Sequence, residues 1–286
     1  MRASLGGPGA RCALPVLALF VVGFVAPLIA VVAFSFMPAR TFSIWQTPTL
    51  ENYETIFQST SYISFLWSLG LATLTVILLA IICYPVAYGL NRVFGRWSMA
   101  LTLLFVIPLF VSENVRLYGW VLFLIKNGVL LGTFKTYFGF EPESILFTRT
   151  AIVLGMVYVY LPFMLFPMSL GVAMVPNEVR EAAYDLGASR WQVFREVELP
   201  LSMPGIVIGF LLTFVLAVGA IAEFKVLGGQ KVIPITHDIE IAFTYAQNWP
   251  LGAALAVLLM LVVGILVLLI LRRFDLDAVL GRRKSP

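Results

Sequence analysis

Long apolar runs are the feature that most constrains how this chain can fold. An α-helix needs about 20 predominantly apolar residues to cross the hydrocarbon core of a bilayer, whereas soluble domains carry roughly 25% charged residues. Here 60% of the 286 residues are hydrophobic and only 12% are charged. We therefore expect an all-α polytopic membrane protein. About six transmembrane helices are predicted, near residues 13–37, 63–90, 99–125, 150–174, 204–227 and 251–271.

Two of these runs have unusual features. Run 13–37 follows Arg2 and Arg11 in the manner of a signal sequence. It is longer than the roughly 7–15 apolar residues of a secretory signal and no A-x-A site follows it, so we expect an uncleaved first span. Run 99–125 is interrupted by the polar sequence SENVR at 112–116. It forms either one long tilted helix or a span followed by a short interfacial helix.

The distribution of basic residues predicts the orientation. With a cytoplasmic N-terminus, twelve Lys and Arg residues lie inside and seven lie outside, and the twelve occupy the shorter loops and tails. Positive charge accumulates on the cytoplasmic side of membrane proteins. We expect both termini, and the loop 175–203, to be cytoplasmic.

The loop 175–203 contains its own helix start and stop signals. Pro176 ends the preceding span, Asn177 is a candidate N-cap, and Glu181 lies in the first turns, where the helix dipole favours negative charge. Gly187 can adopt the left-handed conformation that ends helices. A second amphipathic helix is expected over 189–199. The pattern predicts a helix–turn–helix with small residues at its bend.

Two interpretations of this loop remain open. The first helix could be an amphipathic linker that lies on the membrane surface. Alternatively, it could seat its Ala and Leu side chains in a groove of another protein, with Glu181 at the polar edge. Surface-lying helices usually carry Lys and Arg on the polar face, whereas this helix is mainly acidic. The charge favours a protein partner.

The same loop resembles the signature of ABC importer permeases of the binding-protein-dependent type. That signature is E-A-A, three residues, G-A, and a stretch ending in hydrophobic-x-L-P, and it occurs here within residues 181–200. The resemblance covers nearly the whole chain. It implies one permease domain over 1–286, with core spans at about 63–271, the first span N-terminal to them, and a coupling helix that docks on an ATPase. The residues that would take the coupling role are Glu181, Ala182, Ala183, Asp185, Gly187 and Ala188.

The resemblance also implies the other parts of an importer. These are two ABC ATPase subunits that bind ATP and magnesium, a second permease subunit that is a paralogue rather than a copy, and a periplasmic or lipoprotein solute-binding protein. The location would be the bacterial inner membrane, in contact with lipid. The sequence has no G-x-x-x-x-G-K-[ST] phosphate loop, one His, two distant Cys, and no nucleophile with a base partner. We expect no enzyme activity, cofactor, metal or nucleic-acid partner for this chain.

A weaker resemblance points to the spermidine/putrescine branch of the family. Residues 115–132 are similar to that branch's V-R-T-Y-A-W followed by N-G-x-x-N, although Leu117, Gly119 and Leu131 depart from it. The segment VLGGQKVIPI resembles the branch's L-G-G segment after the fifth span. The resemblance implies a polyamine cargo. Another small solute, such as an amino-acid derivative or an anion, remains an alternative within the same family.

Ionisable residues at membrane depth are costly and are therefore candidates for function. A polycation would be held by carboxylates and by cation–π contacts. The candidate path residues are Glu113, Trp120, Tyr158, Tyr160, Glu223 and Asp238. Alternatively, Glu113 and Arg116 form a structural i,i+3 pair, and the aromatic residues are packing or interfacial groups.

Two other functional classes remain open. A secondary transporter driven by an ion gradient would need a set of charged relay groups, and charges within the spans are sparse here. A non-transporting membrane scaffold would have no ATPase partner.

Overall fold

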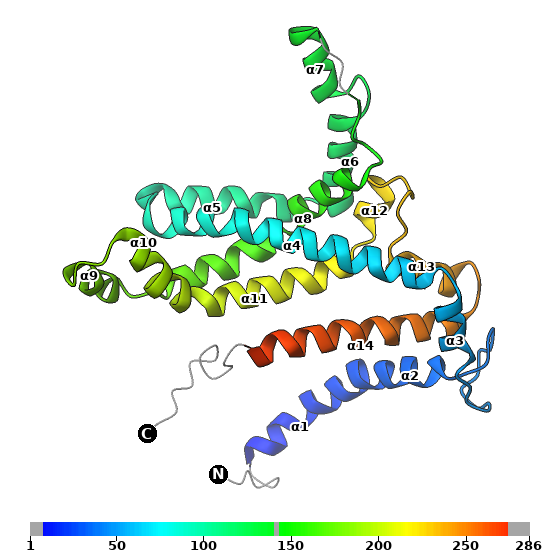
Figure 1. Cartoon of the computed structure of the whole chain (residues 1–286). Coiled ribbons are helices and arrows are strands. Elements are labelled where there is room, and N and C mark those ends of the chain that lie inside the picture. Colours follow the sequence, from blue (N-terminus) through cyan, green and yellow to red (C-terminus); the bar gives the residue numbers. More distant parts are fainter. Residues whose placement is uncertain (1–7, 140–142, 274–286) are drawn as a thin grey trace. The chain divides into compact units, whose positions relative to one another are not determined.

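The structure is a computed structural model that describes residues 8–139 and 143–273 (Figure 1). All regular elements within these residues are helical. Six stretches are long and apolar enough to cross a membrane: Ala13–Ser35, Ser61–Arg92, Glu113–Phe138, Arg149–Ala173, Arg190–Val218 and Trp249–Arg273. The predicted all-α architecture with six candidate spans is confirmed.

The described residues fall into two compact units. One holds the residues up to Ile63 together with His237–Gly264, and the other holds Ser64–Thr236 and the residues from Ile265 onward. The first unit contains α1 (Pro8–Phe20), the π-helical turn η1 (Val21–Val25), α2 (Ala26–Ser35), α3 (Glu51–Gln58), most of α13 (Ile235–Thr244) and much of α14 (Trp249–Arg273).

Side-chain contacts hold the first unit together at the end where α2 meets α3. The amide of Asn52 on α3 is buried and donates hydrogen bonds to the carbonyls of Ser35 (3.1 Å) and Met37 (2.7 Å), which satisfies groups at the end of α2. The Trp249 ring packs against Phe34, Phe42 and Phe243, with centroid distances of 6.5, 5.3 and 6.3 Å. The first span itself buries no residue of its most apolar window. Its apolar side chains are therefore suited to face lipid or another subunit.

The second unit holds the remaining elements. These are α4 (Ser61–Arg92), η2 (Gly95–Trp97), α5 (Ser98–Val106), η3 (Ile107–Phe110), α6 (Glu113–Leu124), α7 (Val129–Phe138), α8 (Arg149–Ala173), α9 (Asn177–Asp185), α10 (Arg190–Gln192), the π-helical turn η4 (Val193–Glu198), α11 (Leu199–Val218) and α12 (Ala222–Val226).

The predicted third span is not one continuous helix. The chain leaves the helical conformation at Val111 (φ −102°, ψ 133°) and Ser112 (φ −52°, ψ 139°), between η3 and α6. Pro108 lacks a backbone N–H, which fits the change from α5 to the 3-10 turn η3 just before the break. Glu113 lies in the first turn of the new helix, where the helix dipole favours an acid. The structure has an interruption at the polar sequence, but neither alternative describes it. The shorter apolar segment Gly95–Phe110 comes first, and α6 and α7 together make the candidate span Glu113–Phe138, which extends beyond the predicted bounds 99–125.

The predicted fifth span is too long at its far end. Helix α11 stops at Val218, and the backbone of Ile221 (φ −137°, ψ −39°) separates it from the short helix α12. The carbonyl of Ala220 in this break accepts a hydrogen bond from the hydroxyl of Thr236 (2.8 Å). Hydropathy did not locate the break because the apolar run continues through it to Ala222, and the charged residues Glu223 and Lys225 come only afterwards.

Helices α8 and α11 meet backbone to backbone. A Cβ added at Gly171 would lie 2.7 Å from the Ser202 carbonyl oxygen and 2.9 Å from the Gly205 Cα, and one added at Gly205 would lie 2.5 Å from the Gly171 Cα. Gly209 follows Gly205 at the i+4 spacing of the G-x-x-x-G motif, which allows close helix approach in membranes, and contacts Met164. This contact forms the core of the second unit.

Candidate coupling loop and cargo path

The loop helix α9 begins and ends at well-defined positions. Pro176 (φ −66°, ψ 140°) is the cap residue and Asn177 is the first helical residue, so the prediction of Asn177 as N-cap was one residue off. At the other end the Gly187 N–H donates to the Tyr184 carbonyl (2.9 Å) and the Ala188 N–H to the Ala183 carbonyl (3.1 Å). These two bonds are those of a Schellman motif, which needs a left-handed residue at Gly187. Gly187 has φ +85°, as predicted.

The second half of the loop joins the fifth span without interruption. Ser189 caps α10 through a capping box: the Gln192 N–H donates to the Ser189 hydroxyl (3.3 Å), and the Ser189 N–H donates to the Gln192 side-chain oxygen (2.8 Å). The chain then passes through the wide turn η4 directly into α11. The helix predicted over 189–199 is thus the N-terminal end of a longer helical segment, Arg190–Val218.

The predicted coupling residues lie on the exposed helix α9 and in the bend that follows it, which contains Gly187 and Ala188. Helix α9 contains no buried residue. Glu181, Ala182, Asp185 and Gly187 are exposed, whereas Ala183 and Ala188 are half-buried. The Leu186 side chain is 89% exposed. An apolar side chain so exposed beside small residues is suited to a protein partner.

A connected set of polar contacts, which sequence reasoning missed, joins α9 to the ends of three long helices. One guanidinium nitrogen of Arg92, at the end of α4, donates to the Asn177 side-chain oxygen (2.5 Å), and the other donates to the carbonyls of Val172 (3.2 Å) and Val175 (2.6 Å). Arg180 donates to the same Asn177 oxygen (3.3 Å). Its Nε forms an ion pair with Glu198 Oε1 (2.5 Å). Arg92, Asn177, Arg180 and Glu198 are called the polar chain below.

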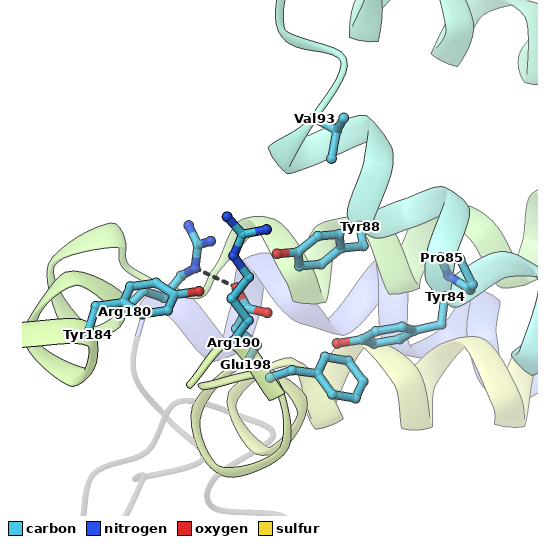
Figure 2. Close-up of a pocket in the computed structure, with 9 residues that line it drawn as sticks. Tyr84, Pro85, Tyr88, Val93, Arg180, Tyr184, Arg190 and Glu198 are labelled. Carbon is cyan, nitrogen blue, oxygen red and sulfur yellow. Dashed lines mark ion pairs between the residues drawn. The ribbon is translucent and has the colours of Figure 1, made fainter. Parts of the chain in front are cut away.

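The Arg180–Glu198 pair lies in the wall of a cavity of about 880 Å³ (Figure 2). Tyr84 and Tyr88 of α4 form one side of the cavity, and residues of α9, α10 and η4 form the other. Glu198 is 4% exposed. Burial lowers the pKa of Arg180, but the nearby Glu198 carboxylate outweighs it, so the pKa of Arg180 is raised and its charge is secure.

Part of the predicted cargo path is brought together at α6 and α8. The rings of Trp120 and Tyr158 meet edge to face at 5.7 Å, and the Arg116 guanidinium lies 5.7 Å from the centre of the Tyr158 ring. These residues line a cavity of about 620 Å³ together with apolar residues of η3 and α6. Among the described residues no ion pair joins Arg116 to Glu113, so the structural i,i+3 pair is not formed.

The acidic candidates lie in different surroundings. Glu223 on α12 is fully buried, and neither of its carboxylate oxygens reaches a hydrogen-bond partner among the described residues. The Tyr160 hydroxyl is the nearest candidate donor, although it does not meet full hydrogen-bond geometry, and Glu113 and Arg116 are near enough to act on the charge. Tyr160 is buried and Glu113 is half-buried. A buried carboxylate without a partner is costly and calls for a ligand or a functional role.

Asp238 belongs to the other compact unit. It lies half-buried in the first turn of α13. Within residues 8–139 and 143–273 no three His, Cys, Asp or Glu side chains gather in a way that could hold a metal ion.

Comparison with known proteins reveals relatives along most of the chain. Residues 76–277 match the family described as "Binding-protein-dependent transport system inner membrane component". The chain is 34% identical over 245 residues to the spermidine/putrescine transport system permease protein PotB of Haemophilus influenzae, with 84% of this chain and 85% of the relative covered. It is 33% identical over 222 residues to PotB of Escherichia coli, with 77% and 80% covered.

A solved structure shares the fold. The crystal structure of a bacterial ABC transporter involved in the import of the acidic polysaccharide alginate has a chain that matches with a TM-score of 0.77 and 18% identity, covering 92% of this chain and 93% of that one. The family that residues 181–200 predicted is thereby confirmed, together with an inner-membrane, multi-pass placement. The chain belongs to the binding-protein-dependent transport system inner membrane components, the permeases of ABC importers.

Proposed function

We propose that this chain is one of two permease subunits of an ATP-driven importer that brings a polyamine, such as spermidine or putrescine, into the cytoplasm. The observation that carries the proposal is the 34% identity to a spermidine/putrescine permease over 84% of the chain. Membership of the permease family leaves no basis for an ion-gradient transporter or a scaffold. Another small charged solute remains the alternative cargo.

In the proposed importer α9 docks into a cleft of an ATPase subunit. Its contact residues are Glu181, Ala182, Ala183, Asp185, Gly187 and Ala188. The exposure of the whole helix supports this role, because small side chains let a partner approach the backbone and the exposed Leu186 offers an apolar anchor. ATP and magnesium are bound by the two ATPase subunits and not by this chain.

The membrane path requires further subunits. A second permease chain, a paralogue rather than a copy, completes the enclosure of the path, and a solute-binding protein delivers cargo from outside. ATP binding draws the ATPase subunits together and shifts the permease pair between inward-open and outward-open states through differential affinity. The excess of Lys and Arg in the inner loops supports cytoplasmic termini and a cytoplasmic α9.

The proposed cargo contacts are Trp120, Tyr158, Tyr160, Glu113, Glu223 and Asp238. Rings of Trp and Tyr bind ammonium groups through their faces, and carboxylates pair with them. The meeting of Trp120 and Tyr158 at one cavity and the unpartnered carboxylate of Glu223 support this assignment. Arg116 in the same cavity repels a cation, so an ammonium group is expected on the side nearer Glu113 and Glu223.

Two measurements on the full complex test the proposal. In the first, Glu181→Lys is expected to abolish both ATPase co-purification and the stimulation of ATP hydrolysis by the binding protein. Glu196→Lys, at an exposed acid that is not one of the proposed contact residues, is expected to leave both unchanged. If the binding protein stimulates ATP hydrolysis normally in the Glu181→Lys complex, docking through α9 is refuted.

The second measurement identifies the cargo. The partner binding protein is heated with spermidine, with amino acids and with small anions, since a ligand held at 100 times its Kd stabilises a protein by about 2.7 kcal/mol. Spermidine is expected to raise the melting temperature. A rise with an anion alone would overturn the polyamine assignment and leave the importer assignment intact.

A further inference from the structure

We propose that the polar chain Arg92–Asn177–Arg180–Glu198 fastens the coupling helix to the membrane helices, so that Arg180 and Glu198 act as positioning residues for the transmission of ATPase motion. The inference rests on the proposed docking of α9. It adds a specific route by which a push on α9 reaches α4, α8 and α11.

Helix α9 could not transmit motion to the membrane helices without side-chain contacts to them. It has no buried residue, and its two ends are the extended Pro176 and the left-handed Gly187. A force applied to such a helix can rotate it about these two non-helical residues, since positions at the ends of elements absorb changes in backbone angle. Stiff transmission therefore needs contacts from the helix itself to the spans.

Arg92 makes the first of these contacts. It is the last residue of α4, and its two guanidinium nitrogens hold the carbonyls of Val172 and Val175 at the end of α8 as well as Asn177 at the start of α9. One side chain thus joins three helix ends. The planar guanidinium fixes their geometry more firmly than a flexible ammonium group would.

The Arg180–Glu198 pair makes the second contact, on the far side of the bend. Arg180 lies one turn into α9, and Glu198 is the last residue of η4, directly before α11. Figure 2 shows this pair between α9 and the helical segment that leads into α11, beside the tyrosines of α4. Because Glu198 is 4% exposed, loss of its partner leaves a buried charge without compensation, which strongly favours keeping the pair closed.

The wide turn η4 aims Glu198 at Arg180. A π-helical turn accommodates one more residue than an α-helical turn, and each residue advances an α-helix by about 100°. A regular helix from Arg190 to Leu199 would therefore turn the Glu198 side chain away by roughly that angle. Single π-helical turns occur frequently at functional sites.

The test uses the complete complex reconstituted in proteoliposomes. Glu198→Gln keeps the side-chain shape and removes the charge, and Glu196→Gln is the matched control because Glu196 is an exposed acid of the same turn. In Glu198→Gln the ATPase is expected to remain bound, while the number of ATP molecules hydrolysed per imported spermidine rises about fivefold or more, in the range of typical coupling free energies. The double variant Arg180→Glu/Glu198→Arg restores the pair and is expected to recover most of the coupling.

A second readout is independent of the cargo. Nitroxide labels are placed at Glu178→Cys on α9 and Leu201→Cys on α11, both exposed positions, in a background with Cys12 and Cys83 replaced by Ala. In the otherwise unchanged chain, the distribution of distances between the two labels is expected to stay narrow with and without ATP. In Glu198→Gln this distribution is expected to broaden.

The outcomes separate the two proposals. If no ATPase binds the unaltered permease, the proposed function fails. If the ATPase binds and Glu198→Gln matches Glu196→Gln in both the hydrolysis ratio and the label distance, the polar chain has no role in transmission. A charge-swapped variant that regains thermal stability without regaining coupling also contradicts the inference, because the pair would then be only structural.

Discussion

The contact between α8 and α11 leads to a quantitative prediction for Gly205→Ala. The added methyl group would lie 2.5 Å from the Gly171 Cα, whereas ordinary contacts of a Cβ begin at 3.4 Å. The neighbouring atoms belong to the backbone of α8, so no side chain can rotate out of the way. The two helices must separate locally by at least about 0.9 Å, the difference between these distances, because the Pro167 carbonyl oxygen lies closer still.

The cost of this separation follows from packing. A gap of 0.5–1 Å removes about a quarter to a half of the dispersion attraction of each contact along the interface. Overpacking of a close-packed core costs about 1–3 kcal/mol. Alanine also favours a helix over glycine by about 0.5–1 kcal/mol, which partly offsets the loss.

Gly70→Ala serves as the matched control. Gly70 lies on α4, and a Cβ there meets nothing within 4 Å. Both variants gain the same helix propensity, so the difference between them isolates the packing cost. We expect Gly205→Ala to be less stable than Gly70→Ala by about 1–3 kcal/mol in the free energy of unfolding, measured by SDS titration in mixed micelles. Equal stabilities would show that α8 and α11 are not in the close contact described here.

Two further predictions concern the loop and the cargo path. The methyl group of Gly187→Ala meets no other atom, but the substitution places a side chain on a residue with φ +85°. The stability of α9 is expected to fall by about 1 kcal/mol, so its amide hydrogens exchange about fivefold faster. Gly187→Asn is expected to have a smaller effect, because Asn tolerates the left-handed conformation better. Exchange at the original rate in Gly187→Ala would show that the bend is not strained. Glu223→Gln is expected to reduce spermidine uptake about tenfold through loss of a charge-assisted contact, whereas Glu143→Gln, at an exposed site, leaves it unchanged. Unchanged uptake in Glu223→Gln would assign that residue to packing.

The sequence predicts features that depend on local patterns. Apolar run length located the spans, since a bilayer imposes the same requirement on every spanning helix. The bend at Gly187 followed from a glycine after a helical stripe, because few other residues adopt a left-handed conformation. The sequence alone did not decide whether run 99–125 is interrupted. Polar residues such as Glu113 occur both within tilted helices and at the start of new helices.

Features that depend on pairing across the fold were not predictable. Gly205 and Gly209 form a visible G-x-x-x-G pattern, but the sequence does not say that Gly171 is the facing residue. Arg180 and Glu198 are separated by a bend and by the wide turn η4, so no helical spacing rule relates them. The burial of Glu223 depends on α12 folding against α6 and α8, after a break in α11 that hydropathy does not register.

The glycine contact between α8 and α11 also determines where this permease can bend. Two helices whose backbones are in contact cannot slide or roll past each other without steric clash. We therefore expect α8 and α11 to move together as one rigid body. The conformational change of a transport cycle must then occur at hinges outside α8 and α11. The non-helical joints at Val111–Ser112, directly before α6, and at Ile221, directly before α12, are the positions where the backbone leaves the helical conformation and can bend.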